Sequence, residues 1–190
     1  MIKKPSPLVL TLIILVVIAS ALVALSGFYV DWLWFESVGF TAVWTKVLTT
    51  KVVLFLVAGF LTSLLIASNV YLAFRSRPFY VPTSVEADNL ERYRATIDPV
   101  RKLAFAGVAL VLFYFGGTSA TSLWSSWLLF QNSTDFGVKD PQFGMDVSFF
   151  AFRLPFWQTL IGWGISTLIL ATLASAAVHY LYGGIRPQVR

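Results

Sequence analysis

The chain of 190 residues has no cysteine, only one histidine and few charged residues, which make up 12% of the sequence. Without cysteine it forms no disulfides and no thiolate metal sites. The sequence also lacks a nucleophile paired with a base, a glycine-rich phosphate loop and a cluster of metal ligands. We therefore expect no enzyme activity, no catalytic residues, no metal and no cofactor. Ordinary soluble domains carry about a quarter charged residues, so the low charge argues against that class.

Long apolar runs dominate the chain instead. Four runs contain no Asp, Glu, Lys or Arg, and they cover residues 8–28, 52–74, 103–123 and 156–181. Each is long enough to cross a hydrocarbon layer of about 30 Å at about 1.5 Å per residue. A soluble helical domain of this size could not bury four such segments and still present a charged surface. The sequence predicts an all-α membrane protein in which residues 1–190 form a single integral membrane domain with four transmembrane helices in the lipid bilayer.

Charge and tryptophan together predict the orientation. Ten of the fourteen Lys and Arg residues precede the first run, separate the second from the third, or follow the fourth. The segments 29–51 and 124–155 hold four cations and five acids, a net charge of −1. All seven tryptophans lie in these segments or in the ends of the runs that adjoin them. The positive-inside rule and the interfacial preference of indole rings agree. We predict a multi-pass cell-membrane protein with cytoplasmic termini, a cytoplasmic loop 75–102 and external loops 29–51 and 124–155.

The amino terminus resembles a secretory signal, because Lys3 and Lys4 precede an apolar stretch. That stretch is longer than the roughly 7 to 15 residues of a signal core. We expect a retained anchor, with cleavage as the alternative.

The predicted cytoplasmic loop contains both basic and acidic residues. Its cations alternate with acids, so we expect no nucleic-acid partner. Within the loop, residues 88–101 have the spacing of a helix, with Glu91 placed to pair with Arg94. We predict a solvated helix there, and a partner-docking surface is the alternative.

The second external loop holds a dense motif of acids and turn residues: Asp135, Asp140, Pro141, Gly144 and Asp146. The turn residues predict a folded turn. Calcium binding by the acids is the alternative, although their spacing does not match a calcium loop. The aromatic residues from 145 to 152 predict an interfacial or re-entrant helix before the fourth span.

Polar and small residues inside the runs are the remaining candidates. In the fourth run a helix places Thr167, Ala171, Ser175 and His179 at successive i+4 positions, with Gly162 and Ser166 as a second pair. Small faces predict close helix packing. For His179 a proton-relay role is the alternative. In the third run, Gly116 and Gly117 would bend the helix or pack a neighbour, or mark a broken helix at a substrate site.

Four motifs carry a resemblance to a known family. They are Val-Asp-Trp-Leu-Trp-Phe at residues 30–35, Arg-Pro-Phe-Tyr-Val-Pro-Thr at 77–83, Asp-Phe-Gly-Val-Lys-Asp-Pro-Gln-Phe-Gly at 135–144, and His-Tyr-Leu-Tyr-Gly-Gly-Ile-Arg at 179–186. Together they resemble the uncharacterised protein family UPF0182 of bacterial multi-span membrane proteins. The resemblance implies a longer protein with further spans and a large extracytoplasmic region, and it supplies no catalytic residues. We expect this chain to be the N-terminal portion, as a fragment, half of a split protein or a truncated relative.

From these features we predict a structural or assembly module. Its spans would pack against further transmembrane segments or an external domain, supplied by a partner chain or by self-association. The alternative is part of a transporter or channel whose polar lining comes from partner spans or self-association.

Overall fold

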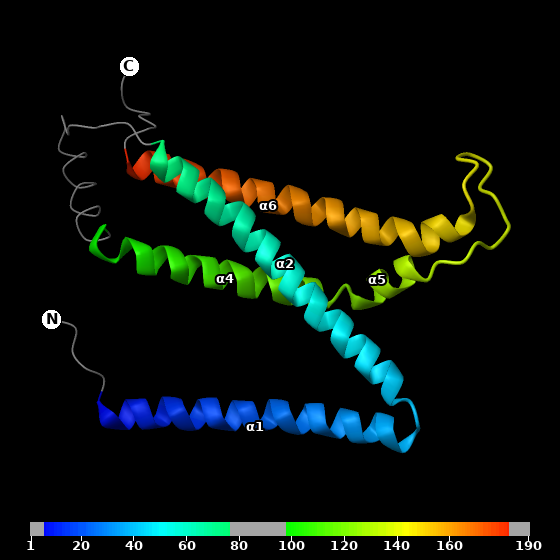
Figure 1. Cartoon of the computed structure of the whole chain (residues 1–190), viewed down its shortest axis with the longest axis horizontal. Helices are drawn as coiled ribbons and strands as arrows, with labels where there is room; N and C mark the ends of the chain where they lie inside the picture. The colour runs from blue at the N-terminus through cyan, green and yellow to red at the C-terminus, as the bar shows by residue number, and fades with distance from the viewer. Residues whose placement is uncertain (1–5, 77–97, 183–190) are drawn as a thin grey trace. The chain divides into compact units, whose positions relative to one another are not determined.

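The computed structural model describes residues 6–76 and 98–182, and most of them are helical (Figure 1). The predicted all-α class is confirmed, because four helices are long and apolar enough to cross a membrane. The motif at 77–83, most of the helix predicted at 88–101 and the residues after 182 lie outside the described residues. The elements are α1 (Pro7–Ser37), α2 (Thr41–Arg75), η1 (Asp98–Val100), α4 (Arg101–Thr121), α5 (Trp124–Gln131), η2 (Phe149–Arg153) and α6 (Leu154–Leu181).

The first two helices extend well beyond the apolar runs that predicted them. With 31 and 35 residues, α1 and α2 are about 46 and 52 Å long at about 1.5 Å per residue. The aromatic segment after residue 28 continues α1, because no Gly or Pro interrupts it before Gly39. Both helices exceed a hydrocarbon layer of about 30 Å, so a membrane would hold them tilted or with projecting ends.

Local signals fix both ends of α1. At the start, the Ser6 hydroxyl accepts a hydrogen bond from the backbone N–H of Val9 at 3.4 Å, and Pro7 occupies the first turn. At the end, the N–H groups of Gly39 and Phe40 donate to the carbonyls of Glu36 and Phe35. Gly39 has a φ of +76°, which an L side chain rarely adopts. This turn leads within three residues to α2, which begins at Thr41.

The chain divides into two compact units, residues 1–49 and 50–190. In the first unit, the rings of Phe28 and Trp44 are 4.9 Å apart and join α1 to the start of α2. In the second, the rest of α2 crosses α4 and lies beside α6 near its carboxyl end (Figure 1). That the whole chain forms a single membrane domain remains a prediction.

The segment between α4 and α6 contains more helix than the sequence suggests. The third apolar run was predicted to end at residue 123, but α4 ends at Thr121 and the short helix α5 follows from Trp124. The Thr121 and Ser122 hydroxyls donate to carbonyls three residues earlier, a pattern that competes with regular helix bonding. The aromatic residues of η2 form a π-helical turn that continues into α6. Their interfacial or re-entrant position remains a prediction.

Candidate functional site

The second unit is held together around Thr62 of α2, which is 7% exposed. From α6, the indole Nε1–H of Trp163 donates to the Thr62 hydroxyl at 3.1 Å. From α4, Gly116 lies so close that a Cβ there would be 2.6 Å from Thr62 Oγ1. Three helices therefore meet at one hydroxyl, and we call Thr62, Gly116 and Trp163 the three-helix contact.

Glycines let the backbones of α2 and α4 approach each other closely. A Cβ on Gly117 would be 2.7 Å from the Phe55 carbonyl oxygen, and one on Gly59 would be 2.6 Å from the Phe113 carbonyl oxygen. Because α4 is continuous through Gly116 and Gly117, these glycines pack a neighbouring helix and do not break their own.

Sequence reasoning missed several residues of this packing. The Ser63 hydroxyl donates to the Ala109 carbonyl oxygen on α4 at 2.9 Å. The rings of Phe55 and Phe113 meet edge to face, 5.4 Å apart. A polar or small residue within an apolar run was the available signal. Asn69 is also a polar residue in such a run, but its side-chain amide donates within its own helix, to the Leu65 carbonyl.

The small-residue face predicted on α6 is split in two. Thr167 and Ala171 are each 3% exposed and buried against the rest of the second unit. Ser175 is half-buried, and its hydroxyl oxygen has no hydrogen-bond partner within the described chain. Gly162 and Ser166 are exposed instead, with open space around the Cβ position of Gly162. His179 is half-buried near the end of the helix. The face thus has a packed part and an open part.

Asp146 organises the loop between α5 and η2. Its Oδ1 accepts hydrogen bonds from the backbone N–H groups of Phe136 and Ser148 at 3.0 and 2.8 Å, and its Oδ2 accepts one from Gly137 at 2.9 Å. Hydrogen bonding lowers the pKa of Asp146 from 3.8 to about 2. The Ser148 side chain has the largest effect, followed by the N–H groups of Ser148, Phe136 and Gly137 in decreasing order. The carboxylate is therefore strongly favoured in its charged form.

The other two acids of the motif also serve the loop. Asp140 Oδ1 accepts the N–H groups of Gln142 and Phe143 at 3.0 and 2.8 Å, which closes the turn after it. Asp135 Oδ1 accepts the Ser148 hydroxyl at 3.3 Å. We call residues 135–148 the aspartate loop. Its backbone pairs Lys139 with Asp146, and Gly137 and Gly144 supply positive φ angles of 77° and 66°.

These acids form hydrogen bonds within the loop itself. Both Asp146 oxygens face N–H donors, and Asp140 points one oxygen at its own turn. Across residues 6–76 and 98–182, no group of three or more His, Cys, Asp or Glu is placed to hold a metal ion. The carboxylates bond the loop's own backbone, so the chemistry they support is loop folding.

Aromatic contacts fasten this loop region to the helices. Phe130 of α5 packs against Phe156 of α6 with ring centroids 4.6 Å apart. Phe136 of the aspartate loop lies 5.4 Å from Phe152 of η2. The Arg153 guanidinium donates from Nε to the Ser133 hydroxyl at 2.9 Å. The aspartate loop is thus a folded extension of α5, η2 and α6.

The sequence matches a known protein family. Residues 8–190 match the uncharacterised protein family UPF0182. The chain is 44% identical over 184 residues to a UPF0182 protein of Streptomyces coelicolor, covering 97% of this chain and 18% of that protein. It is 48% identical over 160 residues to one of Salinispora tropica, covering 84% and 16%. The chain corresponds to their N-terminal part and spans less than a fifth of their length. No solved structure matches.

Proposed function

The chain belongs to the UPF0182 family, and from this membership and the packing described above we propose that it forms an N-terminal membrane module of structural or assembly type. The module is non-enzymatic, and it packs against further membrane or cell-envelope components. The family is uncharacterised, so its name supplies no activity. The proposal therefore rests on what the helices offer to a neighbour.

The observation that carries the proposal is the open part of α6. Gly162 and Ser166 are one helical turn apart and exposed, and the Cβ position of Gly162 has no heavy atom within 4 Å in the described structure. Small residues at this spacing let a second helix approach closely, which drives association in lipid. Glycines allow the same close approach between α2 and α4, at Gly59 and Gly117. A further transmembrane segment is the occupant that matches such a surface.

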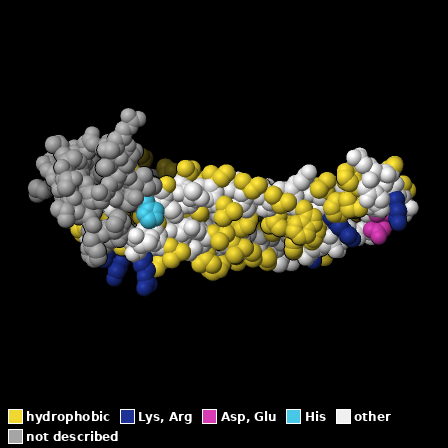
Figure 2. Space-filling view, turned by 90° about the horizontal axis from the view of Figure 1, so that it is seen from above, with side chains coloured by type: hydrophobic (Ala, Val, Ile, Leu, Met, Phe, Trp, Pro, Cys, Tyr) yellow, Lys and Arg dark blue, Asp and Glu magenta, His cyan; other side chains and the backbone are white. Residues whose placement is uncertain are grey.

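The surface of the helices supports a lipid environment. Large apolar side chains on the helices are widely exposed, including Leu110 at 69% and Leu168 at 61%. On the face shown in Figure 2, hydrophobic side chains cover the middle, and Lys, Arg, Asp and Glu side chains show only towards the ends. Such a surface suits hydrocarbon in the middle and water or headgroups at the ends. The proposed setting is the bacterial cell membrane.

The proposed orientation places both termini in the cytoplasm. Arg75 at the end of α2, and Arg101 and Lys102 at the start of α4, support a cytoplasmic position for the connection between these helices. The aspartate loop would then face outward. Its exposed Phe136 and Phe143, at 53% and 60%, offer apolar contacts to an external domain.

The experiment is purification of the natively expressed protein in a gentle detergent, followed by native-gel sizing and mass spectrometry. A stoichiometric larger membrane partner, or a defined oligomer, is the expected result. Gly162→Leu should weaken that assembly, because the added side chain fills the open part of α6. Gly107→Leu is the matched control, since Gly107 is another exposed helical glycine with open space around its Cβ position.

Two outcomes would contradict the proposal. One is a monomer without partners that remains fully folded in detergent and in lipid discs. The other is an assembly that Gly162→Leu and Gly107→Leu weaken equally. Flux of a solute through liposomes that hold only this chain would instead support the transporter alternative.

A further inference from the structure

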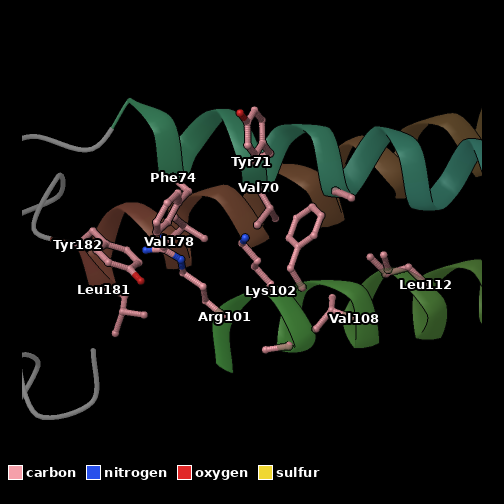
Figure 3. A pocket seen from close by; sticks show the side chains of 14 residues that line it. Val70, Tyr71, Phe74, Arg101, Lys102, Val108, Leu112, Val178, Leu181 and Tyr182 are labelled. Carbon is pink, nitrogen blue, oxygen red and sulfur yellow. The ribbon is translucent and has the colours of Figure 1, made fainter. Parts of the chain in front are cut away.

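An apolar groove opens between α2, α4 and α6 at the end of the second unit where α4 begins (Figure 3). Its volume is about 560 Å³. Its walls are mostly apolar, and its mouth holds two cationic residues from the first turn of α4, Arg101 and Lys102. We call it the basic groove. Its apolar walls include Val70, Phe74, Phe105, Val108, Leu112 and Val178.

Both cationic side chains extend from α4 into the space between the helices (Figure 3). The Arg101 guanidinium carbon lies 5.6 Å from the ring centre of Phe74, close enough for a cation–π contact. Phe74 in turn packs edge to face against Tyr182, with centroids 5.2 Å apart. No Asp or Glu belongs to the residues described as lining the groove. Arg101 and Lys102 place two cations at the mouth, and the amino end of α4 adds a partial positive charge.

The depth of the groove matches one leaflet of a bilayer. Its lining follows α4 from Arg101 to Leu112, which is about 16 Å at about 1.5 Å per residue. Half of a hydrocarbon layer of about 30 Å is about 15 Å. A ligand with an anionic head at the cations and a hydrocarbon tail of leaflet length would match both the charge and the depth.

We propose that the basic groove binds an anionic phospholipid. The phosphate lies at Arg101 and Lys102, and one acyl chain lies along Phe105, Val108 and Leu112. Basic pockets between transmembrane helices are a known way to hold anionic headgroups. On the proposed orientation the lipid comes from the inner leaflet. The inference goes beyond the assembly role, because the open part of α6 takes no part in it.

The test is native mass spectrometry of the natively expressed protein with added phosphatidylglycerol or phosphatidylcholine of the same acyl chains. We expect preferential retention of phosphatidylglycerol. Arg101→Gln and Lys102→Gln should each lower that preference about fivefold, the effect of one cation near an anionic lipid surface. Lys139→Gln is the matched control, because it removes the same charge from the aspartate loop. Ala104→Trp, on the groove wall, should lower the retention of phosphatidylglycerol by filling the space for the tail.

Several results would overturn the proposal. Equal retention of both lipids would contradict recognition by charge. So would an equal loss of the preference for phosphatidylglycerol in Lys102→Gln and Lys139→Gln. Displacement by millimolar inorganic phosphate would indicate a free-anion site. A transmembrane segment cross-linked through position 104 in place of lipid would make the groove a protein interface. Assembly that survives Lys102→Gln while lipid preference is lost separates this inference from the proposed module.

Discussion

Trp163 of α6 donates its indole hydrogen to the hydroxyl of Thr62 on α2, across 3.1 Å and 101 positions of sequence. Both groups lie in apolar runs, where an unpaired polar group is costly. The bond ties α6 to the residue that also meets Gly116 of α4. Loss of the Thr62–Trp163 hydrogen bond should therefore disturb the packing of all three helices.

Thr62→Val keeps the shape of the side chain but removes the acceptor for Trp163. Interhelical hydrogen bonds in membranes contribute about 0.6 kcal/mol on average and about 1.7 kcal/mol at most, so we expect a loss of that size in the free energy of unfolding. Unfolding in denaturing detergent, followed by tryptophan fluorescence, measures it. A double-mutant cycle with Trp163→Phe isolates the pair, and a coupling energy near zero would show that the bond contributes nothing. Thr172→Val is the control, because the Thr172 hydroxyl bonds only within its own helix.

Gly117→Ala should destabilise the protein by about 1 to 3 kcal/mol, as overpacking usually does. The new methyl group would be 2.6 Å from Phe55 Cδ2 and 2.7 Å from the Phe55 carbonyl oxygen, and the backbone cannot move away easily. Gly107→Ala meets nothing within 4 Å and should instead be neutral or stabilising by up to about 1 kcal/mol, through helix propensity. Thermal unfolding in detergent compares the two. Equal midpoints would mean that α2 and α4 do not approach as described.

Ser63→Ala and Ser175→Ala should have different effects. The Ser63 hydroxyl donates to Ala109 on the neighbouring helix, so its removal should cost about 0.6 to 1.7 kcal/mol. The Ser175 hydroxyl oxygen is buried and lacks a partner in the described structure, so its removal should be neutral or stabilising. The same unfolding measurement applies. A larger loss from Ser175→Ala would reveal a partner outside the described chain.

The aspartate loop should depend on pH through Asp146. A carboxyl whose pKa is lowered to about 2 in the folded state adds stability that is fully present above its unfolded value near 3.8. That stability is lost as the pH falls from about 4 towards 2. The protection of the N–H groups of Phe136, Gly137 and Ser148 against hydrogen exchange, taken relative to the intrinsic exchange rate at each pH, should fall across this window. Unchanged protection down to pH 2 would contradict the assignment.

Asp146→Asn should loosen the aspartate loop at neutral pH, because Asp146 accepts hydrogen bonds with both oxygens and an amide keeps only one acceptor. Asp140→Asn should be tolerated, since Asp140 uses only Oδ1 to close its turn and asparagine can replace it there. Limited proteolysis between residues 135 and 148 reports the difference. Equal cleavage rates in the two variants would show that Asp146 has no special role.

Much of the fold could be predicted from the sequence because its causes are local. A run without charges, such as residues 52–74, satisfies its own backbone as a helix and gains by leaving water. The turn around Pro141 and Gly144 also follows from residue chemistry, since proline and glycine restrict the backbone in known ways. The length of α1 could not be inferred from hydropathy, because a helix ends where its capping residues lie and not where its apolar run stops.

The sequence by itself determined that this chain forms apolar helices joined by an acidic, aromatic loop, and which small and polar residues share a helical face. Only the tertiary structure decided which of those residues meet a neighbour. Gly117 is buried against Phe55 whereas Gly162 is open, and Ser63 bonds across helices whereas Asn69 bonds within its own. The physical reason is that these helices are apolar on all sides, so periodicity identifies no inward face. Which small or polar residue contacts a neighbouring helix is decided by where two backbones approach closely. Those positions depend on how α2, α4 and α6 pack together.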